Sequence, residues 1–180
     1  GGPTPADVIT PAAIRNAQRV LLAVSGSTNA VVHMAAVAGR IGMKLDLDDF
    51  NTLSDETPVL VDLKPVGAGY MEDFHYAGGL EGVLREIAPR LETGTRSITG
   101  ETLAERLARP LADPIDRAVI RGIATPISPV GGLIALRGGG RHHFLRHPPR
   151  RLADHGLLFT QQCVGDGGHG QLHPVETSGR

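Results

Sequence analysis

Ser25-Gly26-Ser27-Thr28-Asn29-Ala30 is a short polar stretch that separates two apolar runs. Before it, apolar residues recur at helical spacing over residues 12–24, with Thr10 placed to cap the helix and Pro11 as its first residue. After it, the apolar run of residues 31–38 ends at a glycine, as many helices do. The sequence therefore predicts two helices joined by a turn of small polar residues.

The polar stretch is also the first candidate binding site. Ser27, Thr28 and Asn29 each carry a side-chain oxygen and stand at the predicted N-terminus of the second helix. Unpaired backbone N–H groups and a partial positive charge at a helix N-terminus favour a bound carboxylate or phosphate. An ordinary N-cap after a glycine turn accounts for the same residues, because Ser and Thr cap many helices. Spacing alone leaves both interpretations open.

Length and composition restrict the class of protein. The 180 residues suffice for one domain, or for one domain and part of another. Aromatic residues make up only 3% and Trp is absent, so the core must be built from Val, Leu, Ile and Ala, which suits an α/β protein. The net charge of -1, without a basic block, gives no indication of nucleic-acid binding.

Targeting signals and cysteine usage favour an intracellular protein. No apolar run approaches the roughly 20 residues of a membrane span, and no signal peptide is recognisable. The single cysteine, Cys163, cannot form an internal disulfide, which fits a reducing compartment, so we expect a cytoplasmic protein. Because the chain begins with Gly-Gly-Pro rather than Met, we also expect a fragment of a longer protein.

The following segments predict alternating helix and strand. Residues 45–56 place apolar residues three apart, with Asp46 or Asp48 as the cap, and their acids are better explained by the helix dipole than by a metal site. Residues 59–63 form an apolar run after a proline, which is typical of a buried strand in a parallel sheet. The glycine-rich loop 64–69 comes after that strand, where α/β sheets often bind ligands.

A second candidate site is residues 70–79, which hold two acids, one histidine and three of the six aromatic residues. Glu72 or His75 could serve as an acid, a base or a hydrogen-bond partner of a substrate. The alternative is a single helical turn whose apolar face carries Met71 and Phe74.

The downstream part changes in character. Residues 80–91 predict an amphipathic helix whose apolar stripe covers a sheet, and residues 102–107 predict a short helix. From residue 109 onwards, prolines punctuate short apolar runs, with residues 118–121 and 133–137 as strand candidates.

Three motifs carry a resemblance to one family. Ser25 to His33 resembles the Gly-Gly-Ser-Thr-Asn-Ala-x-x-His segment of the IlvD/EDD dehydratases, with Ser25 in place of the first glycine. Residues 71–79 resemble the family's Met-Glu-Asp-(Leu/Phe)-x-x-Ala-Gly-Gly signature and look closer to its sugar-acid branch, such as arabinonate or xylonate dehydratase. Residues 126–133 resemble its Pro-(Ile/Leu)-(Ser/Thr)-Pro-x-Gly-Gly segment. Ala30 differs from the histidine that is usual in the phosphogluconate branch.

The resemblance implies a fold and a division of the chain. We expect an α/β protein in which residues 1–112 form part of a parallel-sheet domain with flanking helices, and residues 113–138 cross into a β-barrel domain. Residues 139–180 are expected to be an unmatched tail, out of frame or otherwise non-native, because composition and family match change together near Gly140.

The resemblance also implies a reaction. Members are hydro-lyases that convert a 2,3-dihydroxy acid or an aldonate to a 2-keto-3-deoxy acid, using an iron–sulfur cluster and Mg²⁺. We expect Ser27, Thr28 and Asn29 to bind substrate, and we expect no catalytic and no metal-binding residue in this segment. Neither cofactor is expected to bind the fragment, which we expect to be inactive because one cysteine cannot hold a cluster.

Two other functions fit the same residues. Dihydroxy-acid dehydratase of branched-chain amino-acid biosynthesis is an alternative to a sugar-acid enzyme, and a non-catalytic anion-binding α/β module is an alternative of a different class. The expected partner is a small sugar acid or dihydroxy acid, with no nucleic acid and no membrane, and a homo-oligomer at full length. The sequence leaves the substrate and the cluster type undetermined.

Overall fold

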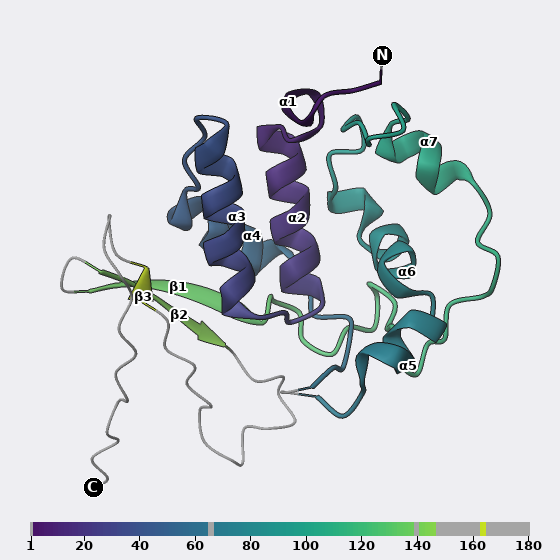
Figure 1. Cartoon of the computed structure of the whole chain (residues 1–180). Coiled ribbons are helices and arrows are strands. Elements are labelled where there is room, and N and C mark those ends of the chain that lie inside the picture. The colour runs from purple at the N-terminus through teal and green to yellow at the C-terminus, as the bar shows by residue number, and fades with distance from the viewer. Residues whose placement is uncertain (1, 65–66, 139–140, 147–162, 165–180) are drawn as a thin grey trace, which may run out of the picture.

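The computed structural model describes residues 2–64, 67–138, 141–146 and 163–164 of the chain. Its helices are α1 (Pro5–Val8), α2 (Pro11–Ala23), α3 (Thr28–Arg40), α4 (Leu47–Glu56), α5 (Met71–Tyr76), α6 (Gly79–Glu86), the 3₁₀ turn η1 (Ala88–Arg90) and α7 (Leu103–Ala108). Its strands are β1 (Leu133–Gly138), β2 (Arg141–Arg146) and β3 (Cys163–Val164), which form an antiparallel sheet in that order (Figure 1).

Helix α2 lies at the centre of the described structure. As expected, it starts after Thr10, whose Oγ1 accepts a hydrogen bond from the Ala13 N–H at 3.2 Å, and Pro11 is its first residue. It packs against α3 and α4 on one side and against α6 on the other (Figure 1). The predicted helix of residues 12–24 is therefore confirmed, and it separates two clusters of buried side chains.

The first cluster lies between α2, α5 and α6. It joins the end of α2 to the apolar segment 59–61, to one residue of α5 and to the stripe of residues 80–91. Its buried members are Ala23, Leu60, Val61, Phe74, Ala77, Val83, Ile87, Leu91 and Ile120. The amphipathic helix predicted for residues 80–91 is thus present, although it changes to a 3₁₀ turn after Glu86 and leaves Leu80 exposed. Its apolar stripe covers the end of α2 and the segment 59–61 rather than the predicted sheet.

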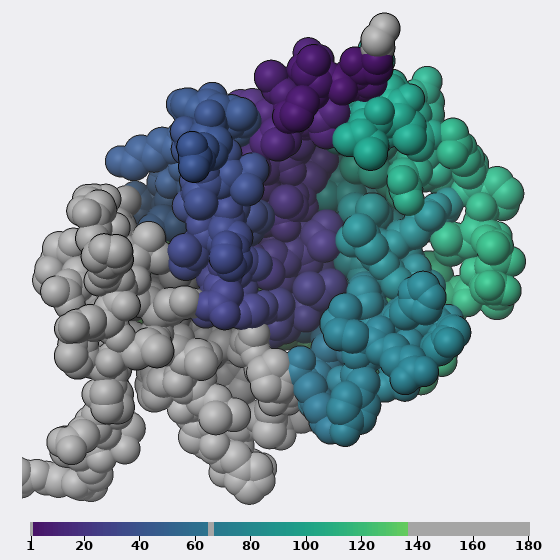
Figure 2. All heavy atoms as spheres, in the orientation of Figure 1, coloured from purple at the N-terminus to yellow at the C-terminus, as the bar shows by residue number. Residues whose placement is uncertain are grey.

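The second cluster lies between α2, α3, α4 and β1. Its buried members are Leu21, Leu22, Val31, Phe50, Leu53, Leu133 and Ala135. Asp46 caps α4 by accepting a hydrogen bond from the Asp48 N–H at 2.9 Å, so the predicted helix of residues 45–56 is confirmed with its cap. The spheres of α2 and α3 adjoin those of α5 and α6 on one face of the molecule (Figure 2).

The parallel sheet is not confirmed in the part of the chain that the structure describes. Residues 59–61 are buried as predicted, but Val59 and Val61 form only isolated antiparallel bridges, to Ser128 and Ile120. The physical reason is the neighbours of this segment, since proline-rich loops rather than extended strands pack beside it and each provides a single bridge. Mixed helix and strand content is what the structure supports.

Other predictions have mixed outcomes. Residues 133–137 do form a strand, β1, and residues 103–108 form α7 after its cap at Thr102. The strand predicted for residues 118–121 is wrong, because residues 117–119 turn and only Ile120 forms a bridge. The segment expected to be a non-native tail, residues 139–180, lies almost entirely outside the described residues, so this expectation is not tested. Within the described segments, no helix combines the length and the apolar character needed to cross a membrane.

Candidate functional site

The turn between α2 and α3 contains a serine, Ser25, with a left-handed backbone conformation. The Ser25 N–H donates to the Leu22 carbonyl at 3.2 Å, and the Gly26 N–H donates to the Leu21 carbonyl at 2.9 Å. This pair of bonds is a Schellman motif, which requires a left-handed residue at the position of Ser25. Ser25 adopts it with φ 48°, and its buried Oγ has no hydrogen-bond partner among the described residues.

The three predicted site residues follow this turn in different environments. Ser27 caps α3, its Oγ accepting a hydrogen bond from the Asn29 N–H at 3.2 Å, and its carbonyl accepts one from the Ala30 N–H at 3.0 Å. Thr28 is buried, whereas the side chains of Ser27 and Asn29 are exposed. Since two first-turn N–H groups already have partners, an anion here would depend mainly on the exposed side chains and the helix dipole.

Two glycines of a distant motif pack closely here, Gly132 against Ser25 of this turn and Gly131 against Ser54 of α4. A Cβ on Gly132 would lie 2.4 Å from Ser25 Oγ, and one on Gly131 would lie 2.6 Å from Ser54 Oγ, so neither position has room for a side chain. The Gly131 N–H donates to the Ser54 carbonyl at 2.7 Å. The structure thus brings the motif of residues 126–133 onto the Ser-Thr-Asn turn, although about 100 residues separate them in the chain.

The second candidate cluster is at the surface. Phe74 is the buried residue of α5, and Glu72 and His75 are exposed on it. The Asp73 carboxylate caps the helix by accepting a hydrogen bond from the Tyr70 N–H at 2.8 Å. The helix predicted for residues 70–79 is therefore confirmed, but Met71 is exposed, so only Phe74 forms its apolar face. Among the described residues, Glu72 and His75 have no partner of the kind that an acid–base pair needs.

A glycine-rich turn precedes α5. The Gly69 N–H donates to the Asp62 carbonyl at 2.9 Å, and a Cβ on Gly67 would lie 2.0 Å from Asp62 Oδ1, so the loop folds closely over this residue. Lys64 Nζ lies 3.6 Å from the centroid of the Tyr70 ring and hydrogen-bonds its hydroxyl. These contacts hold the loop against the start of α5.

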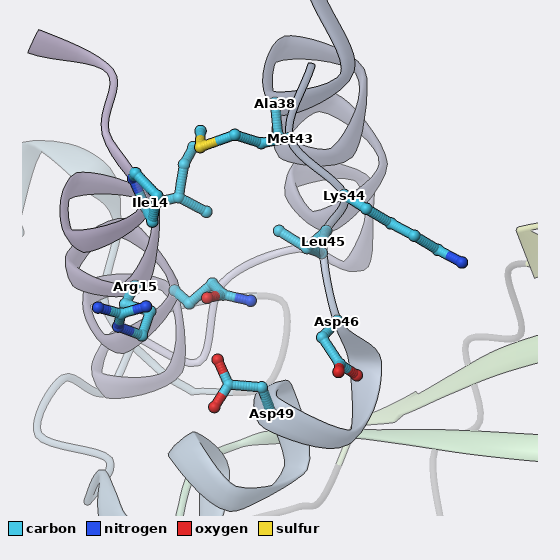
Figure 3. A pocket seen from close by; sticks show the side chains of 10 residues that line it. Ile14, Arg15, Ala38, Met43, Lys44, Leu45, Asp46 and Asp49 are labelled. Carbon is cyan, nitrogen blue, oxygen red and sulfur yellow. The ribbon is translucent and has the colours of Figure 1, made fainter. Parts of the chain in front are cut away.

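The sequence did not predict a cavity that lies between α2, α3 and α4. It has a volume of about 300 Å³, and its lining residues are Pro11, Ile14, Arg15, Gln18, Ala38, Met43, Lys44, Leu45, Asp46 and Asp49 (Figure 3). The residues from α2 recur at positions 11, 14, 15 and 18, which is one face of a helix. That spacing was visible in the sequence, but nothing in it showed that charged and apolar side chains would share one hollow.

An ion pair lies beside this cavity. Arg15 Nε donates to Glu92 Oε1 at 2.6 Å, and Arg15 Nη2 donates to Glu92 Oε2 at 3.1 Å. These bonds raise the pKa of Arg15, with a smaller contribution from the nearby Asp49 carboxylate, and they lower the pKa of Glu92, against the effect of desolvation.

The described residues do not fit the metal groups that the resemblance implies. Within the described part of the chain, no three side chains of His, Cys, Asp or Glu come together as an iron–sulfur cluster or a divalent cation would require. No step through either group is therefore assigned to these residues.

Comparisons with known proteins confirm the family resemblance. The family model for the dihydroxy-acid/6-phosphogluconate dehydratase N-terminal region matches residues 2–106. A mitochondrial dihydroxy-acid dehydratase of Aspergillus fumigatus is 40% identical over 136 residues, covering 74% of this chain and 22% of the relative. The chloroplastic dihydroxy-acid dehydratase of Arabidopsis thaliana is 42% identical over 139 residues, which cover 74% of this chain and 22% of the relative.

A bacterial relative gives the longest of these matches. The dihydroxy-acid dehydratase of Nitratidesulfovibrio vulgaris is 41% identical over 163 residues, which cover 89% of this chain and 27% of the relative. The chain therefore spans about a quarter of the length of the curated relatives that it matches. With more than half of its residues matched by the family model, the chain belongs to the dihydroxy-acid/6-phosphogluconate dehydratase family.

Proposed function

We propose that this chain is part of a dihydroxy-acid dehydratase, a hydro-lyase that removes water from a 2,3-dihydroxy acid to give a 2-keto-3-deoxy acid. The observation that carries this proposal is the match of residues 2–106 to the family together with relatives from a fungus, a plant and a bacterium that bear this name. Because the chain spans about a quarter of those relatives, the activity belongs to the longer protein.

The proposed substrate is a branched 2,3-dihydroxy acid of amino-acid biosynthesis rather than an aldonate. The sequence of α5 resembles the sugar-acid branch, but the helix has an exposed polar face and the relatives reported above are named dihydroxy-acid dehydratases. A short exposed helix is weaker support for a substrate class than a match over most of the chain.

Within that reaction, we assign Ser27, Thr28 and Asn29 to the wall of the substrate site. The exposed Ser27 hydroxyl and Asn29 amide can donate hydrogen bonds to a carboxylate, and the positive end of the α3 dipole favours one there. Thr28 is buried and supports the turn. Gly132 packs directly against Ser25 at the start of this turn.

The longer protein would supply the catalytic groups. An iron–sulfur cluster and Mg²⁺ are part of the proposal for the full-length enzyme, and this chain alone, with its single Cys163, is expected to be inactive. A homo-oligomer in the cytoplasm remains our prediction, although two relatives are named mitochondrial and chloroplastic.

The division of the chain is likewise a proposal. We place the α/β part at residues 1–112, the crossover to a barrel at 113–138 and a non-native tail at 139–180. The match to the bacterial relative, at 89% of the chain, is longer than the part before residue 139, so the tail is the least supported of the three. Resequencing the coding DNA tests it, since an uninterrupted frame through Gly140 would contradict a frameshift.

Single substitutions at the turn test the assigned role. In the full-length protein, Asn29→Ala and Ser27→Ala should each lower kcat/KM for the dihydroxy acid about tenfold, mainly through KM, because each removes a hydrogen bond to the substrate carboxylate. The measurement is the initial rate of 2-keto acid formation over a range of substrate concentrations.

Thr52→Ala is the control, since this exposed threonine lies on α4 and its hydroxyl donates only to the Asp48 carbonyl, at 3.3 Å. Its kcat/KM should equal that of the unchanged protein. If an active enzyme shows unchanged kinetics in both turn variants, the assigned role is wrong. A full-length protein that binds carboxylates without dehydrating them would instead support an anion-binding module.

A further inference from the structure

Gln18 contributes its side-chain amide to the cavity between α2, α3 and α4. Gln18 is only 2% exposed and lines the cavity, and its side chain has no hydrogen bond to any residue that the structure describes. The buried polar atoms without a partner among the described residues do not include this amide, so it reaches the solvent in the hollow. The Gln18 amide, a donor and an acceptor at once, is therefore available to a ligand in the cavity.

Groups of both charges surround this amide. Asp46 and Asp49 at the start of α4 face a side of the cavity that Arg15 also lines, and Figure 3 shows the Asp49 carboxylate turned towards Arg15. Nε and Nη2 of Arg15 donate hydrogen bonds to Glu92, so Nη1 is the group of Arg15 that could donate to a ligand. One cavity thus offers acceptors for an ammonium group and donors for a carboxylate.

The remaining lining is apolar except for Lys44, whose side chain points away from the hollow (Figure 3). Ile14, Ala38, Met43 and Leu45 contribute its apolar part, and Met43 extends across the hollow towards Ile14 (Figure 3). A volume of about 300 Å³ is at the small end of the range for ligand sites, so the occupant would be a small metabolite rather than a nucleotide.

We propose that this cavity binds a small aliphatic α-amino acid. Its ammonium group would lie against the carboxylates of Asp46 and Asp49, its carboxylate against Arg15 and the Gln18 amide, and its side chain against Met43 and its apolar neighbours. This inference is independent of the dehydratase reaction and would hold if that reaction were wrong.

Three probes with one carbon skeleton test the proposal on the 180-residue chain. Leucine carries both charged groups, 3-methylbutylamine lacks the carboxylate, and 4-methylpentanoate lacks the ammonium group. We expect leucine to bind at millimolar concentration and each of the others to bind at least about tenfold more weakly, because each loses a charge-assisted hydrogen bond. The readout is the ¹⁵N–¹H spectrum, in which the Gln18 side-chain amide should shift with leucine.

Variants separate the cavity from the rest of the surface. Asp49→Asn should weaken leucine binding about tenfold, and Gln18→Leu should weaken it and remove the shifting amide signal. Asp55→Asn is the matched control, because it makes the same charge change on α4 outside the cavity and should leave binding unchanged. A dispersed spectrum for each variant shows that it is folded.

Three results would overturn the proposal. They are no binding of leucine at millimolar concentration, equal affinity for leucine and either of the other two probes, and equal loss of binding in Asp49→Asn and Asp55→Asn.

Discussion

Ser25 holds a backbone conformation that glycine adopts at lower cost. Its φ of 48° lies in the left-handed region, where a Cβ is unfavourable, and the buried hydroxyl has no partner among the described residues. The family motif has glycine here, so the substitution in this chain adds strain to the turn that presents Ser27 and Asn29.

Replacing that serine should therefore stabilise the protein. Ser25→Gly is expected to raise the free energy of unfolding by about 0.5–1 kcal/mol, the relief of strain exceeding the added freedom of the unfolded chain. Urea denaturation measures it. Ser97→Gly, at a half-buried residue without positive φ, should lower stability instead, because it also removes the hydroxyl that bonds Thr99. A lower midpoint for Ser25→Gly than for the parent would contradict this account.

The pair of Arg15 and Glu92 should make stability depend on pH. The hydrogen bond from Arg15 lowers the pKa of Glu92 below the ordinary value of 4.5. A carboxylate with a lowered pKa contributes stability above its unfolded pKa and loses it as the pH falls through the folded pKa. Since both side chains are about 40% exposed, the contribution should stay below about 1 kcal/mol.

Glu92→Gln tests this dependence. The variant should be less stable than the parent at neutral pH, and the difference should shrink as the pH falls through the lowered pKa of Glu92, because the carboxylate is then protonated. Glu72→Gln, at an exposed carboxylate of α5, is the control and should show no such difference. The measurement is the urea denaturation midpoint at several pH values. A difference in midpoint between parent and Glu92→Gln that does not change with pH would contradict a contribution from the ion pair.

Two asparagines join elements that are distant in sequence. Asn16 donates to the Glu92 carbonyl at 3.0 Å and accepts from the Glu92 N–H at 2.9 Å, which ties α2 to the segment after η1. Asn51 makes the same pair of bonds to β1. Its amide donates to the Ala135 carbonyl at 2.8 Å and accepts a hydrogen bond from the Ala135 N–H at 2.7 Å. Each amide thus substitutes for a neighbouring strand.

Loss of the Asn51 amide should loosen β1. Asn51→Ala leaves the N–H and carbonyl of the buried Ala135 without these bonds, at a cost of about 2–3 kcal/mol. Hydrogen exchange at the Ala135 amide should accelerate in this variant and stay unchanged in Thr52→Ala. Equal exchange in both variants would show that the amide does not hold the strand.

Helices were more predictable than strands because their signals are local. Thr10, Asp46 and Thr102 cap helices within three residues of themselves, so the sequence shows the start of each. The segment 59–61 has the composition of a parallel strand, but its partners are set by loops more than 50 residues away. No sequence pattern near these residues predicts those partners, and none predicts the two hydrogen bonds between Asn51 and Ala135.

For the whole molecule, the three motifs predicted the family. Their arrangement in space follows from packing and could not be predicted from the sequence. Gly132 packs against Ser25, a contact that the sequence does not predict because about 100 residues separate the two. The cavity between α2, α3 and α4 was missed for the same reason, since Arg15, Gln18 and Asp49 come together only after folding. Local periodicity identifies helices, whereas sites formed between elements require the fold.

The most direct test of the proposed function is substrate choice by the full-length protein that contains this chain. Initial rates of 2-keto acid formation are measured with a branched 2,3-dihydroxy acid and with arabinonate or xylonate under anaerobic conditions. We predict a kcat/KM at least about 100-fold higher for the branched dihydroxy acid, because a site shaped for an aliphatic branch leaves the extra hydroxyls of a sugar acid unpaired. A preference for the aldonate, or dehydration of neither substrate, would contradict the assignment.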